Sequence, residues 1–354
     1  MISTAPTEAS GESLAAELEA PSQTRSGTVA ARSEPSVAVV VPAYRVASHI
    51  ESVVKTIPSW VRWIIVVDDA SPDAGKDIVA RLAMDDLRVQ LVRHEVNRGV
   101  GGAVCSGYRH ALSLGADIAV KMDGDGQMDP RYLRALLSPI LRGDADYTKG
   151  NRFHHGAELT RMPFVRLVGN AALGFLVRIS SGYWNLYDPT NGYTAIHRKV
   201  LRQLPLEALA RDYFFESDML GQLGLLSACV MDVPIPARYA DETSSLRIGR
   251  VLYRFPPLLL RGFLRRLWKR HLMATFSVFG LYVSVGTVLL LLGSAFGLWH
   301  WVHSILTGSP ATAGTVMLGA LPVLLGFQLL IQAIAVDVAG VPRIPLSRQP
   351  DPED

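Results

Sequence analysis

Two long uncharged stretches lie near the end of the chain. Residues 274–298 and 311–336 contain no Asp, Glu, Lys or Arg. Each is longer than the ~20 residues that an α-helix needs to cross the hydrocarbon layer of a membrane. The linker between them holds Trp299, Trp301 and two histidines, which suit a turn at the membrane surface. We therefore expect two transmembrane helices, joined as a hairpin, within residues 273–338.

Basic residues flank this predicted hairpin and are absent from its tip. Five Lys or Arg lie just before the first span, and Arg343 and Arg348 follow the second. Positive charge is retained on the cytoplasmic side of a membrane. We therefore expect a multi-pass protein of the cell inner (cytoplasmic) membrane, with both termini and the large N-terminal part in the cytosol.

Residues 247–272 show the pattern of amphipathic helices next to a membrane. Apolar residues recur there at helical spacing, whereas Arg261, Arg265 and Lys269 fall on another face. An ordinary surface helix has the same pattern, but the position beside a predicted span favours a helix lying in the headgroup layer. Its basic groups would then contact anionic lipid.

Short apolar runs alternate with helical patterns in the N-terminal part of the chain. Strands are predicted at residues 37–44, 63–71, 89–94 and 117–123, and helices at about 47–57, 73–84, 101–114 and 130–141. This alternation predicts an α/β fold with a mostly parallel sheet and helices on both faces. In such sheets, ligands bind beyond the carboxyl ends of the strands.

The same patterns divide the chain into segments. Residues 1–35 lack the basic start and apolar run of a secretory signal, and their composition predicts a disordered tail. Residues 36–246 form the predicted cytosolic domain, residues 247–272 the juxtamembrane helices, and residues 339–354 a cytosolic tail.

Composition narrows the classes of function. The 354 residues carry a net charge of only +3, so the chain lacks the basic excess of a nucleic-acid binder, and we expect no nucleic-acid partner. Cys105 and Cys229 form neither a metal-ligand spacing nor a disulfide framework. Two reduced thiols in a cytosol-facing protein are the simplest interpretation.

The strand predicted at residues 117–123 ends in the stretch DGDGQMDP. Asp123, Asp125 and Gln127 place two carboxylates and an amide at alternate positions. One carboxylate there would be ordinary capping, whereas this set indicates a site for a hard cation. Mg²⁺ or Mn²⁺ binds through few carboxylates and completes its shell with substrate phosphates. A diphosphate-containing substrate would fit, because the metal would neutralise the charge on the leaving diphosphate.

Asp68 and Asp69 end the second predicted strand, so these acids are expected at the same edge of the sheet as Asp123.

Three other kinds of ligand site, for a dinucleotide, for a nucleotide phosphate and for calcium, are excluded by the sequence. Val104 occupies the third glycine position of a dinucleotide-binding fingerprint, and the chain has no Walker lysine motif. Met128 and Arg134 replace the turn glycine and the closing Glu of an EF-hand loop.

Seven motifs follow one another in a recognisable order. They are VVPAY, VVDDASPD, NRGVGGAV, DGDGQMDP, GNRF, DPTNGY and YFFESDML. Together they resemble inverting family 2 glycosyltransferases of the polyprenyl-phosphate type, a group that includes dolichol-phosphate mannose synthases and undecaprenyl-phosphate glucosyltransferases. The resemblance covers roughly residue 37 to the end of the second predicted span.

The resemblance implies a fold and an activity. The fold would be a GT-A-type, Rossmann-like sheet. The activity would be metal-dependent transfer of a hexose from a nucleotide sugar, of the UDP-glucose or GDP-mannose class, to polyprenyl phosphate at the cytosolic membrane face. Because the QxxRW motif of processive synthases is absent, a single transfer fits better. Related enzymes form tetramers, so a homo-oligomer is expected.

The resemblance also implies roles for individual residues. Those implied to bind the nucleotide sugar are Pro42, Tyr44, Asp68, Asp69, Asp123 and Gly124. Those implied to hold the metal are Asp123, Asp125 and Gln127, and those implied to be catalytic are Asp125, Arg152 and Arg166. Those implied to contact the acceptor or a phosphate are Arg152, Arg166, Asp188, Glu216, Asp218, Arg238 and Ser245. The sequence leaves open which of Glu216 and Asp218 faces the site.

Two alternatives remain beside this interpretation. The same chemistry could serve another membrane glycolipid or a glycan chain, and a non-catalytic membrane scaffold could share the fold. A scaffold needs none of Asp123, Asp125, Gln127 and Arg152, so their presence favours an enzyme. The donor base and the sugar are left open by these patterns.

Overall fold

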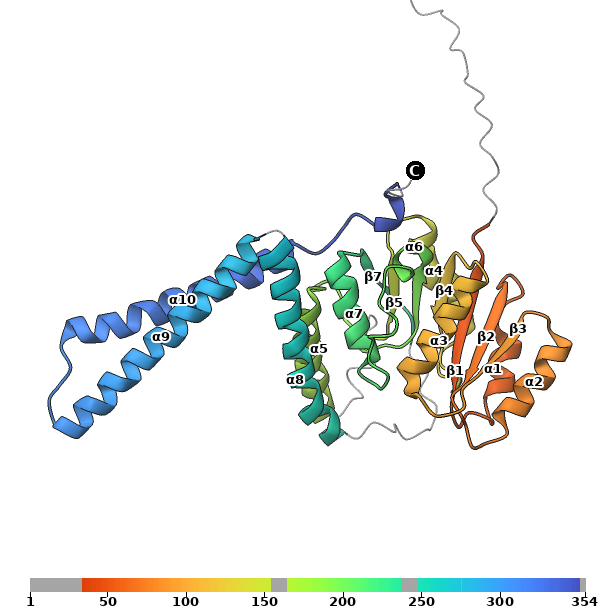
Figure 1. The fold of residues 1–354 in the computed structure, drawn as a ribbon, viewed down its shortest axis with the longest axis horizontal. Helices are drawn as coiled ribbons and strands as arrows, with labels where there is room; N and C mark the ends of the chain where they lie inside the picture. The colour runs from red at the N-terminus through yellow and green to blue at the C-terminus, as the bar shows by residue number, and fades with distance from the viewer. Residues whose placement is uncertain (1–33, 154–163, 237–247, 275, 351–354) are drawn as a thin grey trace, which may run out of the picture. The chain divides into compact units, whose positions relative to one another are not determined.

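The structure is a computed structural model that describes residues 34–153, 164–236, 248–274 and 276–350 (Figure 1). Its strands are β1 (Val37–Ala43), β2 (Trp63–Asp68), β3 (Val89–Arg93), β4 (Ile118–Lys121), β5 (Tyr147–Asn151), β6 (Thr194–His197) and β7 (Val230–Pro234). The helices among these strands are α1 (Ile50–Thr56), α2 (Gly75–Asp85), α3 (Gly99–Ser113), η1 (Pro130–Tyr132), α4 (Leu133–Leu141), α5 (Phe164–Ser181), α6 (Arg198–Leu201) and α7 (Phe215–Leu226).

The strands form one mixed sheet that is mostly parallel. Within the described residues its order is β3-β2-β1-β4-β6-β5-β7. The pairs β1–β2, β1–β4, β2–β3 and β5–β7 are parallel, whereas β6 runs antiparallel to both β4 and β5. The predicted α/β fold is therefore confirmed, with three strands beyond the four that the apolar runs indicated.

Both faces of the sheet are buried, which explains why its central strands are apolar at almost every position. Successive side chains of a strand point to opposite faces. Val39 and Val41 of β1 pack in a core with α1, α2 and α4, while Ala38 and Val40 pack in a second core with α3, α5 and α7 (Figure 1). A strand covered on both faces has no solvent-facing positions for polar residues.

A second group of helices follows the sheet. Helix α8 (Ile248–Arg266) continues into the π-helical segment η3 (Leu267–Ala274), and the long helices α9 (Val278–Thr307) and α10 (Ala313–Ala339) come next. Helices α9 and α10 are long and apolar enough to cross a membrane, judged by length and composition.

Glycines bring α9 and α10 close together. A Cβ atom on Gly326 would lie 2.7 Å from the carbonyl oxygen of Gly286, and one on Gly293 would lie 3.0 Å from that of Gly319. Backbones that approach this closely leave room only for hydrogen at these positions. The small residues of the two helices thus pack the hairpin itself.

The turn of the hairpin is shorter than predicted. The sequence indicated a linker at residues 299–310, but α9 continues to Thr307 and includes Trp299 and Trp301. The helix ends where Gly308 adopts φ 66°, a left-handed conformation that glycine adopts easily. Trp299 and Trp301 therefore lie in helix, and the turn lies between Thr307 and Ala313.

The described part of the predicted C-terminal tail contacts the sheet domain. A short 3₁₀ turn, η4 (Leu346–Arg348), places the backbone N–H groups of Leu346 and Ser347 on the carboxylate of Asp146, each at 2.8 Å. The Arg348 guanidinium also donates to the backbone oxygen of Arg142 at 2.9 Å. This segment is therefore docked on the domain.

Candidate active site

The carboxyl ends of β1, β2 and β4 meet at one edge of the sheet. Asp68 ends β2 and pairs in register with Ala43, which ends β1. Asp123 follows β4, which also pairs in parallel with β1. A Cβ atom on Gly124 would lie 3.2 Å from the carbonyl oxygen of Pro42, so this glycine lets the chain pass closely over β1. The strand-end acids thus share this edge.

Asp69 connects the loop after β2 to the start of α3. Its carboxylate accepts hydrogen bonds from the backbone N–H groups of Arg98 and Gly99, both at 2.8 Å, and lies 2.7 Å from His94 Nδ1. Asp68 and Asp69 are both buried. The contacts of Asp69 hold the fold of this edge together, and its implied contact with a nucleotide stays a prediction.

A buried lysine lies at the centre of the edge. Lys121 ends β4, and its Nζ atom lies 2.8 Å from Asp123 Oδ1 and 3.1 Å from Glu216 Oε1. It also donates to the backbone oxygen of Gly192 at 3.3 Å. Burial lowers the pKa of this ammonium, but the two carboxylates outweigh burial and raise the pKa above its ordinary value. Lys121 therefore stays charged and joins Asp123 to helix α7.

The DPTNGY segment closes over these charges. A Cβ atom on Gly192 would lie 2.5 Å from Lys121 Nζ and 3.0 Å from Asp123 Oδ2. No larger side chain fits there without moving both charged groups. Gly192 therefore permits the ion pair and the segment to pack together.

A second lysine, Lys149 of β5, is also fully buried. Its ammonium donates to the backbone oxygen of Asn191 in the same segment. Burial lowers the pKa of Lys149 to about 8, although the carboxylates of Glu216 and Asp188 act in the opposite direction. The two lysines and the carboxylates of Asp123, Asp188 and Glu216 thus form one charge cluster beneath the edge.

Glu216 and Asp218 face different neighbours on α7. Glu216 pairs with Lys121, as described, whereas Asp218 accepts from Arg265 Nη2 at 3.0 Å and from the backbone N–H of Ala210 at 3.0 Å. Residues two apart on a helix point in roughly opposite directions, about 200° apart. Of the two acids, Glu216 is therefore the one that pairs with Lys121 in the charge cluster.

Arg152 and Asp188 form a forked ion pair at the end of β5. Arg152 Nε and Nη2 lie 2.7 Å from Asp188 Oδ2 and 3.1 Å from Asp188 Oδ1. Asp188 is fully buried, while the Arg152 side chain is 39% exposed. The buried carboxylate therefore fixes the orientation of a guanidinium that remains open to solvent.

The other predicted site residues are placed less closely together. Tyr44 is exposed and lies under the Arg45 guanidinium, which is 5.3 Å from the ring centroid. Arg166 belongs to α5. Arg238 and Ser245 lie outside the described residues. The implied roles of these residues stay predictions.

Comparison with known proteins identifies the family. Residues 38–204 match the model for glycosyl transferase family 2. Over 234 residues the chain is 30% identical to the UDP-N-acetylglucosamine–dolichyl-phosphate N-acetylglucosaminyltransferase of Methanococcus voltae, an alignment that covers 61% of this chain and 93% of that protein. The chain belongs to glycosyl transferase family 2.

Two further proteins are similar to this family 2 glycosyltransferase. The undecaprenyl-phosphate mannosyltransferase of Micrococcus luteus is 35% identical over 173 residues, which cover 49% of this chain and 70% of that protein. A solved structure, glucosyl-3-phosphoglycerate synthase from Mycobacterium tuberculosis in complex with Mn²⁺ and UDP-glucose, is 23% identical with a TM-score of 0.49; the match covers 65% of this chain and 79% of that one. The match to the family model and the two relatives named for polyprenyl-phosphate acceptors confirm the predicted family resemblance.

The oxygen donors of this family 2 glycosyltransferase suit a hard cation. Asp125 and Gln127 lie in a turn after β4, where Asp125 Oδ1 accepts from the Gln127 backbone N–H at 3.0 Å. No group of three or more His, Cys, Asp or Glu that could hold a metal occurs among the described residues. Mg²⁺ and Mn²⁺ tolerate such a sparse set, because substrate phosphates and water complete the shell. The residues therefore fit a cation that binds together with a diphosphate.

Sequence reasoning missed the two buried lysines of the family 2 domain. Lys121 ends the apolar strand β4, in IAVK, whereas Lys149 lies at the centre of β5, in YTKGN, which no apolar run marks as a strand. A lysine inside an apolar strand is rarely buried unless it is paired. That signal was available for Lys121 alone, and the partners of the two lysines, Glu216 and Asn191, lie far away in the sequence.

Proposed function

We propose that this chain is an inverting hexosyltransferase that moves a single hexose from a nucleotide sugar to polyprenyl phosphate. The observation that carries the proposal is a feature shared by the two named relatives. Both have a polyprenyl phosphate, dolichyl or undecaprenyl, in their names, while their sugars differ. The acceptor class is thus common to relatives whose donors are not, so the donor base and sugar of this chain are left to experiment.

The proposed reaction needs a nucleophile, a leaving group and charge stabilisation. A phosphate oxygen of the acceptor attacks C1 of the sugar from the face opposite the diphosphate. The bond from C1 to the diphosphate breaks, and the nucleotide diphosphate leaves with the electron pair. Because a lipid phosphate is already anionic near neutral pH, the step requires no protein base.

The residues of the sheet edge supply positive charge for two phosphorylated substrates. Asp188 binds Nε and Nη2 of Arg152 and so orients the guanidinium, whose positive charge would attract phosphate oxygens. Lys121 fixes Asp123 at the end of β4. Asp123, Asp125 and Gln127 would hold a divalent cation, Mg²⁺ or Mn²⁺, which supplies charge neutralisation at the leaving diphosphate.

The proposal includes a location in the cell inner (cytoplasmic) membrane. Helices α9 and α10 would cross the bilayer, with the sheet domain and both termini in the cytosol, because Lys and Arg gather on that side of the hairpin.

We also propose a homo-oligomer. Large apolar residues on the exposed surfaces of α9 and α10, such as Leu291, Leu292 and Leu324, are available for contacts between copies.

The proposed enzyme is distinguished from a membrane scaffold by one substitution. Asp125→Asn in the full-length protein, purified into lipid discs, keeps the size of the side chain and removes its charge. We expect transfer from a panel of UDP- and GDP-sugars to short-chain polyprenyl phosphate to fall at least about 100-fold, as when a group that stabilises the transition state is lost. The melting temperature should stay close to that of the wild type. Wild-type protein that transfers no sugar from any donor would contradict the proposal.

A further inference from the structure

Helix α8 packs along helix α7, beginning at the first turn of α7. The ring of Phe255 in α8 meets the ring of Phe214, the residue before α7, edge to face, with the centroids 5.2 Å apart. Arg254, the neighbour of Phe255, lies with Nη2 2.8 Å from Asp212 Oδ2. Both charged groups of this ion pair reach solvent, so the pair adds little to the aromatic contact. The start of α7 is thus held against α8.

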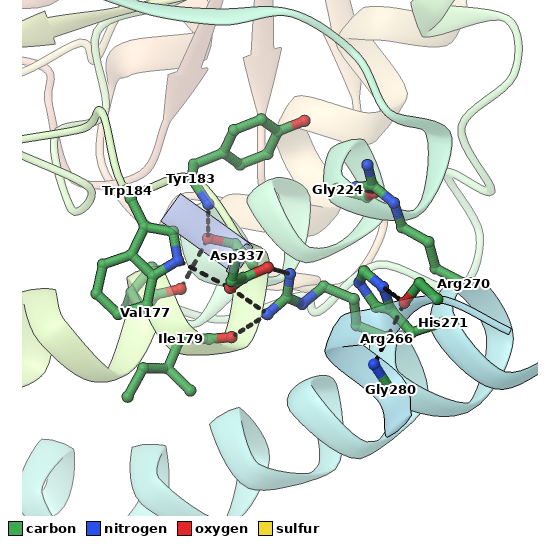
Figure 2. A network of polar contacts seen from close by, with 12 residues as sticks. Val177, Ile179, Tyr183, Trp184, Gly224, Arg266, Arg270, His271, Gly280 and Asp337 are labelled. Carbon is green, nitrogen blue, oxygen red and sulfur yellow. Dashed lines mark hydrogen bonds and ion pairs between the residues drawn. The ribbon is translucent and has the colours of Figure 1, made fainter. Parts of the chain in front are cut away.

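Two arginines continue the contact toward the other end of α7. Arg265 Nη2 donates to Asp218 Oδ1 at 3.0 Å, and the Asp218 side chain is only 13% exposed. Beyond α8, in the segment η3, Arg270 Nη1 donates to the backbone oxygen of Gly224 at 2.7 Å (Figure 2). Contacts therefore join α8 and η3 to α7 along most of its length.

Arg266, next to Arg265, anchors the end of α8 to two other helices. Its Nη1 and Nη2 atoms bind the two carboxylate oxygens of Asp337 in α10 at 2.7 and 2.9 Å (Figure 2). Nη2 also donates to the backbone oxygen of Ile179 in α5 at 2.8 Å, and Trp184 Nε1 donates to Asp337 at 2.8 Å. Both Arg266 and Asp337 are buried. A buried ion pair therefore fixes the end of α8 to the apolar hairpin.

The first turn of α7 connects these contacts to the candidate active site. Glu216 lies 3.1 Å from Lys121 Nζ, which lies 2.8 Å from Asp123 Oδ1. Asp218 fixes the same turn, because its Oδ2 atom accepts from the backbone N–H of Ala210 at 3.0 Å. A shift of this turn would move Glu216 relative to Lys121 and so disturb the cation that fixes Asp123.

We propose that Arg265 and Asp218 are positioning residues through which α8 holds Glu216, and with it the Lys121–Asp123 pair, in the geometry that catalysis needs. The effect on catalysis rests on the proposed function, whereas the link between α8 and the sheet edge does not. Packed side chains and ion pairs of this kind carry coupling between distant sites. Because Arg266 ties the same end of α8 to α10, the geometry of the sheet edge depends on the hairpin.

The test compares two arginines of α8 in full-length protein in lipid discs. Arg265→Gln removes the contact with Asp218, whereas Arg261→Gln removes the same charge from an exposed position of the same helix. Each variant loses one positive charge, so attraction to anionic lipid falls equally and a difference between them reports the contact. Arg265→Lys should restore most of the wild-type behaviour, because the charge is kept and the contact uses a single donor atom.

Steady-state kinetics separate positioning from lipid attraction. We expect Arg265→Gln to lower kcat roughly tenfold and to leave the KM for polyprenyl phosphate unchanged, because the residues it disturbs act in the transition state. Asp218→Asn should have the same effect, and adding it to Arg265→Gln should change little, since both remove one contact. Arg261→Gln should keep the wild-type kcat. An equal rise in the KM for the lipid in both arginine variants, with normal kcat, would overturn the proposal.

Hydrogen exchange tests the link without any substrate. In Arg265→Gln, peptides that cover β4 and the following turn, residues 118–127, should exchange roughly threefold faster than in the wild type, with no change in Arg261→Gln. Faster exchange confined to α7 and α8 would show a local contact and overturn the proposal. Asp218→Asn tests the same contact if Arg265→Gln fails to fold. Wild-type protein that transfers no sugar would contradict the proposed function alone, and the exchange comparison would still decide the link.

Discussion

Lys121 connects the acid that follows β4 to the helix on the opposite side of the candidate site. Its Nζ atom lies 2.8 Å from Asp123 Oδ1 and 3.1 Å from Glu216 Oε1, and the lysine itself is buried. A buried cation between two carboxylates holds both in place only as long as the cation is present. The position of Asp123 at the sheet edge therefore depends on a residue that lies outside the sequence motif.

Replacing Lys121 should damage both stability and activity. Lys121→Met leaves Asp123 and Glu216 without their shared cation, and we expect a loss of about 3–5 kcal/mol in the free energy of unfolding. Turnover should fall with it, because Asp123 is no longer fixed. Denaturant unfolding in detergent and a transfer assay measure the two effects. The control is Lys55→Met, whose exposed partner is Glu51 and which should change little. A Lys121→Met protein with normal stability would contradict the role we assign to this residue.

The buried Lys149 predicts a dependence of stability on pH. Burial lowers its pKa from 10.5 to about 8 in the folded protein, so the unfolded chain binds the additional proton between these two values. Stability should therefore rise as pH increases from about 8 to about 10.5, by up to roughly 3 kcal/mol for this group. The measurement is the difference between wild type and Lys149→Met, which cancels the titration of other groups. Parallel curves for the two proteins would show that Lys149 titrates normally.

The forked geometry of Arg152 should matter more than its charge. Arg152→Lys keeps the charge but cannot make both contacts with Asp188, so the cation is no longer oriented. We expect kcat/KM to fall at least tenfold, equivalent to about 1.4 kcal/mol of transition-state stabilisation. Arg88→Lys disrupts a similar fork, in which Nε and Nη2 of Arg88 bind the two oxygens of Asp86 away from the site, and serves as the control. Equal activity of the two lysine variants would remove Arg152 from the proposed mechanism.

The ion pair of Arg266 and Asp337 should behave as a buried pair whose single members are costly to remove. Asp337→Leu leaves the buried Arg266 without its carboxylate, and we expect a loss of about 3–5 kcal/mol in the free energy of unfolding. The double variant Arg266→Met, Asp337→Leu removes both charges and should be more stable than Asp337→Leu alone. Unfolding of the three proteins in the same detergent gives the comparison. A double variant that is no more stable than Asp337→Leu would mean that the two charges do not stabilise each other.

The sequence was most informative where a local pattern determines the structure. The apolar runs that form β1, β2 and β4 stand out because both faces of those strands are buried, whereas β3, at the edge of the sheet, is only partly buried. Strand β5, with a lysine at its centre, and the four-residue β6 carry no such signal. In the same way, the length of α9 was underestimated because aromatic and histidine residues were interpreted as a turn.

The candidate site was predictable to the extent that it follows strand ends. Asp123 and Asp68 could be placed at one edge from strand order alone. The choice between Glu216 and Asp218 could not be made, because it depends on how α7 packs against Lys121 and Arg265. Arg265 was expected to contact lipid, yet the structure pairs it with Asp218. Long-range pairs of this kind follow from tertiary packing, which no local pattern reports.

The most direct measurement of the central claim compares two acceptors that differ by one group. Purified full-length protein in lipid discs would receive a labelled nucleotide sugar with either a short polyprenyl phosphate or the corresponding polyprenol, and mass spectrometry would identify the lipid product. We predict one hexose on the polyprenyl phosphate, with inverted configuration at C1, and no product from the polyprenol, which lacks the anionic nucleophile. Equal transfer to both lipids, or transfer only to a different glycolipid or glycan, would contradict the account.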